Sequence, residues 1–222
     1  MLIRATVRSR SKKKKKKGKA EAQLADFLKE EIQAEKQLAR EQLQGSEAPT
    51  IPGFQIATED ADVTLSKTHG KETITVKFNV NHTVDMPPQA GMDPSQQQVQ
   101  SVPMLSKPSF LVEVSKDNQK LVFDCNFVEN FEDPDQPRDQ ESNYDMFNIE
   151  EVYLYNGESS DKVYAVSGEV LDGTLYDHLM NYLEERGINA EFSQNLVQFS
   201  THYEHAQYVA LLQKIRDFVS RE

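Results

Sequence analysis

Two histidines near the C-terminus, His202 and His205, have a spacing that could place both on one metal ion. They lie three residues apart in a stretch with helical periodicity, and residues three apart share a helix face. The only adjacent carboxylate is Glu204, and no cysteine is close in the sequence. The run from Thr201 to Glu204 also has the pattern of a capping box. We therefore predict that both histidines are exposed first-turn side chains and that no metal is bound here.

The other candidate chemical groups also favour structural roles. Asp177 and His178 are adjacent, so on a helix their side chains point apart. Cys125 is the only cysteine, and it lies in a row of alternating apolar residues, where a small buried side chain is expected. The sequence has no phosphate-binding glycine loop, nucleophile elbow or zinc-helix motif. We predict no enzymatic activity, no catalytic residue and no cofactor.

A block of carboxylates with a single cation, Arg138, covers residues 129–151. Two prolines interrupt it, so we expect largely a loop. A calcium-binding EF-hand requires acidic residues at loop positions 1, 3 and 5 and glycine at position 6, and Pro137 breaks that pattern. We predict an acidic surface for basic partners, formed by Glu129, Glu132, Asp133, Asp135, Asp139, Glu141, Asp145, Glu150 and Glu151.

The N-terminus has the opposite charge. Residues 1–19 hold ten of the 25 basic residues and none of the 36 acidic ones, so residues 20–222 carry a formal net charge of −21. This basic segment could be a mitochondrial presequence, an arm that binds an anionic partner, or a solvated tail. The residues that could form such an arm are Lys12, Lys13, Lys14, Lys15, Lys16, Lys17 and Lys19.

The remaining 203 residues fit one domain. No apolar run of about 18 residues is present, so no membrane-spanning helix is expected. A single cysteine excludes an intrachain disulfide and favours a reducing compartment.

Hydrophobic periodicity predicts the order of the elements. Residues 20–44 form an amphipathic helix that needs another surface for stability. A weak strand in 54–65 and a long strand in 72–84 are followed by a long loop over 86–108. A hairpin turns at residues 116–119, and a second hairpin-like pair turns at Gly157.

The last fifty residues have helical periodicity. Asp172 and Gly187 are the expected N-cap and stop of one helix; Asn189 caps a short helix, and Thr201 opens the final one. Helix, antiparallel strands and helices in this order indicate an α+β fold. The apolar residues expected to pack the first and last helices are Leu24, Phe27, Leu28, Ile32, Tyr208, Leu211, Leu212, Ile215 and Phe218.

Three C-terminal segments carry a family resemblance: "LYDHLMNYLEERGI", "FSQNLVQFS" and "EHAQYVALLQKIRDFV". In combination they resemble the signature region of the mitochondrial acidic matrix protein family, also called the mitochondrial glycoprotein family. The close resemblance covers residues 171–222, and the rest of the chain is similar in the layout of its elements.

The resemblance implies a strongly twisted antiparallel sheet of about seven strands, flanked by one N-terminal and two main C-terminal helices, in a homotrimeric ring. It also implies a cleavable presequence and residence in the mitochondrial matrix. Family members are non-enzymatic scaffolds or chaperones for basic and RNA-associated proteins, and support RNA processing, including RNA editing, translation and respiration. The alternative hypothesis is a direct RNA-binding factor that uses the lysine arm, with steeply salt-dependent affinity.

Overall fold

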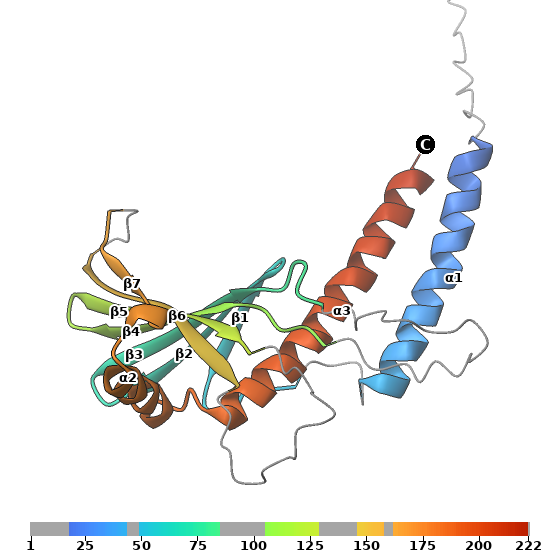
Figure 1. The fold of residues 1–222 in the computed structure, drawn as a ribbon. Coiled ribbons are helices and arrows are strands. Elements are labelled where there is room, and N and C mark those ends of the chain that lie inside the picture. The colour runs from blue at the N-terminus through green and yellow to red at the C-terminus, as the bar shows by residue number, and fades with distance from the viewer. Residues whose placement is uncertain (1–17, 44–48, 85–104, 129–145, 158–161, 222) are drawn as a thin grey trace, which may run out of the picture.

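The computed structural model describes residues 18–43, 49–84, 105–128, 146–157 and 162–221 (Figure 1). The predicted basic arm therefore lies outside the described residues, except for Lys19. Most of the predicted loop over 86–108 and seven of the nine carboxylates of the acidic block also lie outside them.

Seven antiparallel strands form one sheet in the order of the chain, with β1 and β7 at its edges. The strands are β1 (Gln55–Glu59), β2 (Asp62–His69), β3 (Glu72–Asn79), β4 (Phe110–Lys116), β5 (Gln119–Phe127), β6 (Phe147–Asn156) and β7 (Ala165–Ser167). The helices are α1 (Lys19–Gln42), the short 3₁₀ helix η1 (Gly168–Val170), α2 (Gly173–Glu185) and α3 (Ala190–Ser220). The predicted α+β class with seven antiparallel strands and one N-terminal and two main C-terminal helices is confirmed.

Alternating apolar residues place one face of the sheet in the main core. Ile74, Val76 and Phe78 of β3 are buried, and so are the residues paired with them on β4. In β5, Phe123 and Cys125 are fully buried. The predicted structural role of Cys125 fits its position, since burial raises the pKa of the Cys125 thiol far above its usual range.

Two predicted strands have different bounds in the structure. Residues 54–65 are not one strand, because the chain turns between β1 and β2 at Asp60, which has a φ of 49°. Aspartate tolerates this left-handed conformation better than most residues. The strand predicted over 72–84 ends at Asn79, whose side chain accepts a hydrogen bond from the Asn81 backbone N–H. Such local side-chain bonds favour turns over strands.

The predicted cap residues start and stop α2. Asp172 Oδ1 accepts a hydrogen bond from Leu175 N at 3.2 Å, and Gly187 follows the helix with a φ of 72°. Asn189 caps the next helix by accepting from Phe192 N at 2.9 Å.

The helix that follows is a single helix, so the prediction of a short helix after Asn189 and a separate final helix opened by Thr201 is wrong. Thr201 Oγ1 donates to the Val197 carbonyl at 2.7 Å and accepts from the Ser106 backbone N–H at 3.0 Å. The hydroxyl thus bonds to the preceding turn and to a neighbouring segment, which leaves it inside a continuous helix.

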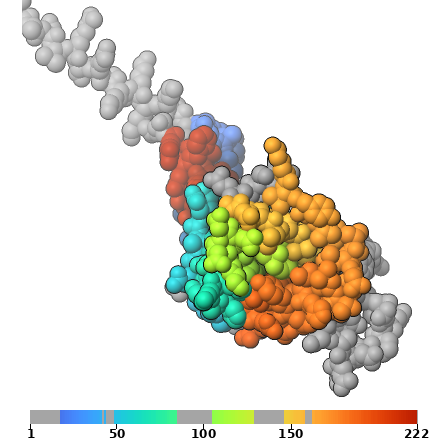
Figure 2. Space-filling view, turned by 90° about the vertical axis from the view of Figure 1, so that its left-hand side faces the viewer, coloured from blue at the N-terminus to red at the C-terminus, as the bar shows by residue number. Residues whose placement is uncertain are grey.

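α2 and the first half of α3 cover one face of the sheet, whereas the second half of α3 extends away and pairs with α1 (Figure 1). Figure 2 shows the same arrangement from the side, with α1 and the end of α3 projecting together from the body. None of the described helices is both long and apolar enough to cross a membrane.

An ion pair joins the end of α2 to the sheet. Arg186 Nε and a terminal guanidinium nitrogen donate to the two carboxylate oxygens of Glu72 at 2.9 and 3.2 Å. Arg186 also donates to the Tyr182 carbonyl and lies over the Tyr182 ring, 3.3 Å from its centroid. The hydrogen bonds from Arg186 lower the pKa of Glu72. Both side chains are largely buried, so each needs its partner.

Replacing Arg186 with Met leaves Glu72 without its partner and should lower the free energy of unfolding by about 3 kcal/mol. Because the folded pKa of Glu72 is depressed, its contribution is present at neutral pH and lost as pH falls below the ordinary value of 4.5. Urea unfolding at neutral and acidic pH measures both effects.

The matched control is Arg216→Met, which removes an arginine from an exposed pair with Asp217. This change should alter stability by no more than about 0.5 kcal/mol. Equal losses in the two variants would contradict a special role for the pair with Glu72.

Candidate functional site

α1 and α3 pack through a small apolar core of their own. Leu28 and Ile32 of α1 are buried against Val209 and Leu212 of α3, and Ile215 packs beside them. Leu28 and Ile32 are four residues apart, and Val209 and Leu212 are three apart, so one narrow stripe of each helix faces the other. Of the nine predicted packing residues, Leu28, Ile32, Leu212 and Ile215 thus lie in contact within one chain.

The other five predicted packing residues lie at the surface of the same helical pair. Phe27 is 59% exposed and Phe218 is 74% exposed. Their large apolar area faces water in the single chain, which is typical of a surface that another molecule covers. The exposed apolar residues of α1 and α3 are Leu24, Phe27, Leu38, Tyr208, Leu211 and Phe218.

The prediction that His202 and His205 are exposed first-turn side chains is wrong, because both are partly buried and lie near the middle of α3. His205 Nε2 is 3.0 Å from Glu35 Oε2 of α1. Burial lowers the pKa of His202, while a hydrogen bond with the backbone of Leu43 acts in the opposite direction. Among the described residues, no group of three or more histidine, cysteine or acidic side chains could hold a metal ion.

The acidic block is described only at its C-terminal end. Glu150 and Glu151 belong to β6, so the predicted loop ends before them. A register shift between Asp124 and Cys125 leaves one extra residue on β6 at this point. Burial, together with the negative charges of Glu151 and Glu150, raises the pKa of Asp124. Three carboxylates therefore lie near one another across β5 and β6.

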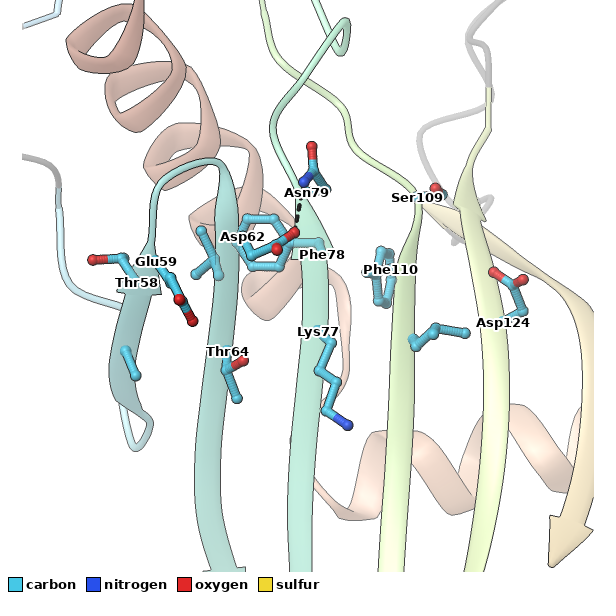
Figure 3. A pocket seen from close by; sticks show the side chains of 13 residues that line it. Thr58, Glu59, Asp62, Thr64, Lys77, Phe78, Asn79, Ser109, Phe110 and Asp124 are labelled. Carbon is cyan, nitrogen blue, oxygen red and sulfur yellow. Dashed lines mark hydrogen bonds between the residues drawn. The ribbon is translucent and has the colours of Figure 1, made fainter. Parts of the chain in front are cut away.

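The sheet face away from the core carries an open hollow of about 720 Å³ (Figure 3). Thr64, Lys77, Leu111 and Asp124 lie side by side across β2 to β5. Lys77 Nζ is 2.9 Å from Glu113 Oε2, so its charge is already paired. The hollow can accept polar or cationic groups. The sequence does not predict this hollow, because the hollow is formed by residues of several strands whose order in the sheet is known only from the structure.

Lys19, the last residue of the predicted basic arm, is the first residue of α1 and is exposed. Asp177 and His178 lie exposed on α2. The structure brings none of these residues together with the acidic side chains of β5 and β6.

These observations define an acidic α+β protein with an open seven-stranded antiparallel sheet and an apolar helical pair beside it. Two solved structures have the same fold: a hypothetical protein from Leishmania major, described as a homologue of human p32, and the Trypanosoma brucei p22 protein. The first is 19% identical with a TM-score of 0.64, over 90% of this chain and 99% of that one. The second is 23% identical with a TM-score of 0.65, over 91% of this chain and all of that one.

The chain belongs to the mitochondrial glycoprotein family (MAM33), whose model matches residues 28–219. It is 44% identical to conserved regulator of innate immunity protein 3 from Caenorhabditis elegans, over 90% of this chain and 83% of that protein. It is 32% identical to the human mitochondrial complement component 1 Q subcomponent-binding protein, over 89% of this chain and 71% of that protein. The bovine protein of that name is 35% identical, over 87% of this chain and 70% of that protein. The family resemblance predicted from the C-terminal segments is confirmed.

Replacing Leu28 with Ala should loosen α1, because this side chain is buried between the helices and its loss leaves a cavity. We expect the docking of α1 on α3 to weaken by about 2 kcal/mol. Limited proteolysis at the end of α1 and amide hydrogen exchange across residues 19–42 measure this. Leu38→Ala, at an exposed position of the same helix, should change docking by no more than about 0.5 kcal/mol. Equal effects would contradict the observed packing.

Proposed function

We propose that the protein is a non-enzymatic, homotrimeric acidic scaffold of the mitochondrial matrix that binds basic or RNA-associated proteins. In this role it supports mitochondrial RNA processing, translation and respiration, with chaperone-like activity toward its partners. The observation that carries the proposal is the charge of −21 on residues 20–222 within a member of the mitochondrial glycoprotein family. An acidic field of this size attracts cationic proteins and speeds their capture.

Names of relatives support a binding role and a mitochondrial location. The bovine and human relatives are named as mitochondrial proteins that bind a complement subcomponent. The basic residues at the start of the chain fit a presequence, which would be removed to leave the acidic body.

The exposed apolar side chains of α1 and α3 support the proposed trimer. A ring requires two different complementary surfaces on each subunit, and the helical pair offers one that a neighbour would cover. Phe27 lies on the face of α1 beside its buried stripe, so contact with a neighbouring subunit would leave the packing against α3 intact.

Phe27→Asp should convert the trimer to monomers, because a charge in a subunit interface is costly to bury. Sedimentation measures the assembly, and far-UV circular dichroism checks that the fold is kept. The control is Tyr164→Asp, at a side chain that is 84% exposed and lies beside β7, and this variant should stay trimeric. A wild-type monomer, or a trimeric Phe27→Asp variant, would contradict the proposal.

A labelled basic protein should bind residues 20–222 with an affinity that falls steeply with salt. Replacing the nine carboxylates of the acidic block by amides should weaken binding by about tenfold. The control replaces exposed carboxylates elsewhere, Glu41, Asp177, Glu184 and Glu185, and should weaken binding less. If the two variants lose affinity in proportion to the charge removed, the overall field binds the partner and the block is not a distinct surface.

The same salt series with a labelled RNA distinguishes the alternative function, direct RNA binding by the lysine arm, from the proposed scaffold. RNA that binds only the full-length chain, and persists near physiological salt, would assign the function to the lysine arm. The proposed scaffold predicts that residues 20–222 retain the basic protein and that neither form holds RNA well.

A further inference from the structure

The two edge strands of the sheet, β1 and β7, differ in how well they are protected from pairing with another chain. β7 has only three residues and leads directly into η1. β1 has five residues, of which four are exposed, and it contains neither of the residues, lysine and proline, that commonly block an edge strand. β1 is therefore the more open edge, and it borders the hollow on the outer face (Figure 3).

The register of the sheet fixes the direction of the backbone groups at the β1–β2 turn. Val80 N donates to the Ala61 carbonyl at 3.0 Å, so the backbone groups of Ala61 face β3. Successive residues of a strand direct their backbone groups to opposite sides. The groups of Asp62 therefore face β1, where this residue pairs with Glu59.

The same alternation along β1 leaves two residues with backbone groups at the free edge. Since the groups of Glu59 face β2, the N–H and C=O groups of Thr58 and Ile56 face outward. No hydrogen bond joins these outward groups to another residue within the described ranges of the chain. An unpaired edge of this kind is a template for a further strand.

The side chains beside this edge differ between the two faces of the sheet. Ile56 packs against the main core, whereas Glu59 lines the hollow on the outer face. Together with Asp60 and Asp62, Glu59 places three carboxylates within four residues. Asp60 meets Lys214 at 3.8 Å, but both side chains are largely exposed, so this pair is weak. The end of β1 at the turn is thus complementary to cationic side chains on the outer face.

We propose that β1 binds an extended segment of a basic protein by strand addition. The main chain of the segment bonds to the outward groups of Ile56 and Thr58, and its alternate side chains select the segment. Cationic side chains lie on the outer face beside Glu59 and Asp62, and apolar side chains lie beside Ile56. The inference rests on the proposed capture of basic proteins, and it gives that capture a defined site separate from the acidic block.

Binding of two synthetic peptides to the full chain tests strand addition. Both peptides alternate arginine and valine, and the second carries methyl groups on its backbone nitrogens, which removes the donors and keeps the charge. The ordinary peptide should bind about tenfold more tightly, because it alone donates main-chain hydrogen bonds. It should also slow amide hydrogen exchange in residues 54–61, because Ile56 and Thr58 become paired.

Thr58→Pro removes an outward N–H and keeps the bonds between β1 and β2, and proline is tolerated on an edge strand where the nitrogen faces solvent. This variant should bind the ordinary peptide about tenfold more weakly and the methylated peptide unchanged. Urea unfolding checks that the fold is kept. Thr58→Lys, which retains the N–H and places a repelling cation at the edge, should also weaken binding if proline disturbs the hairpin.

A matched pair of charge variants tests the cationic side of the site. Glu59→Gln should weaken binding of the ordinary peptide about threefold. Glu184→Gln, at an exposed position of α2, removes the same charge away from β1 and should change binding less.

Several results would overturn strand addition. Equal, salt-sensitive binding of the two peptides, or binding that neither Thr58 variant changes, would overturn it and leave capture by the overall acidic field standing. Absence of salt-sensitive binding of either peptide would overturn the proposed function as well. Dissociation of the assembly in a folded Thr58→Pro variant, measured by sedimentation, would assign the edge to contact between subunits and would also overturn it.

Discussion

The unbroken course of α3 is the constraint on which the rest of the structure depends. Its 31 residues span about 46 Å at 1.5 Å per residue, and only the first half of the helix packs on the sheet. Phe192, Leu196 and Phe199 in its first half complete the main core, whereas Val209 and Leu212 in its second half contact only α1 within the described apolar clusters. One rigid helix therefore carries two separate cores, and it fixes where α1 can lie.

The two cores differ in what they can contribute to stability. The main core joins β-strands, α2 and α3, whereas the second core has four buried side chains. At roughly 1.5–3 kcal/mol for each buried apolar side chain, the second core must offset the ordering of a 24-residue helix that is marginal in isolation. α1 therefore belongs to the less stable part of the fold. A polar contact such as His205–Glu35, or the proposed coverage by a neighbouring subunit, would therefore have a proportionally large effect on α1.

Local chemistry explains which elements could be predicted from the sequence. Asp172, Gly187 and Asn189 act within one helical turn, and hydrophobic periodicity indicated the strand that contains β3, so these features were predicted correctly. The turn at Asp60 and the continuity of α3 past Thr201 were not, because each depends on a tertiary partner. Tyr203 donates to the Asp60 carbonyl, and Ser106 donates to Thr201. The apolar stripe of α1 was recognised, but periodicity alone does not distinguish buried Leu28 from exposed Phe27. Nothing in the sequence pairs Glu35 with a histidine 170 residues away.

In the described part of the protein, some cationic side chains already form ion pairs with carboxylates of the same chain. Arg186 pairs with Glu72, and Lys77 pairs with Glu113. Pairing of opposite charges leaves the net charge unchanged, so the overall excess of negative charge remains. Salt therefore acts on two different interactions. It screens the attraction between exposed carboxylates and the proposed basic partner, which acts over many ångströms, but it screens partly buried pairs much less. If the protein binds a basic partner as proposed, the internal pairs should hold the fold at salt concentrations that already release this partner, so that binding is reversed without unfolding.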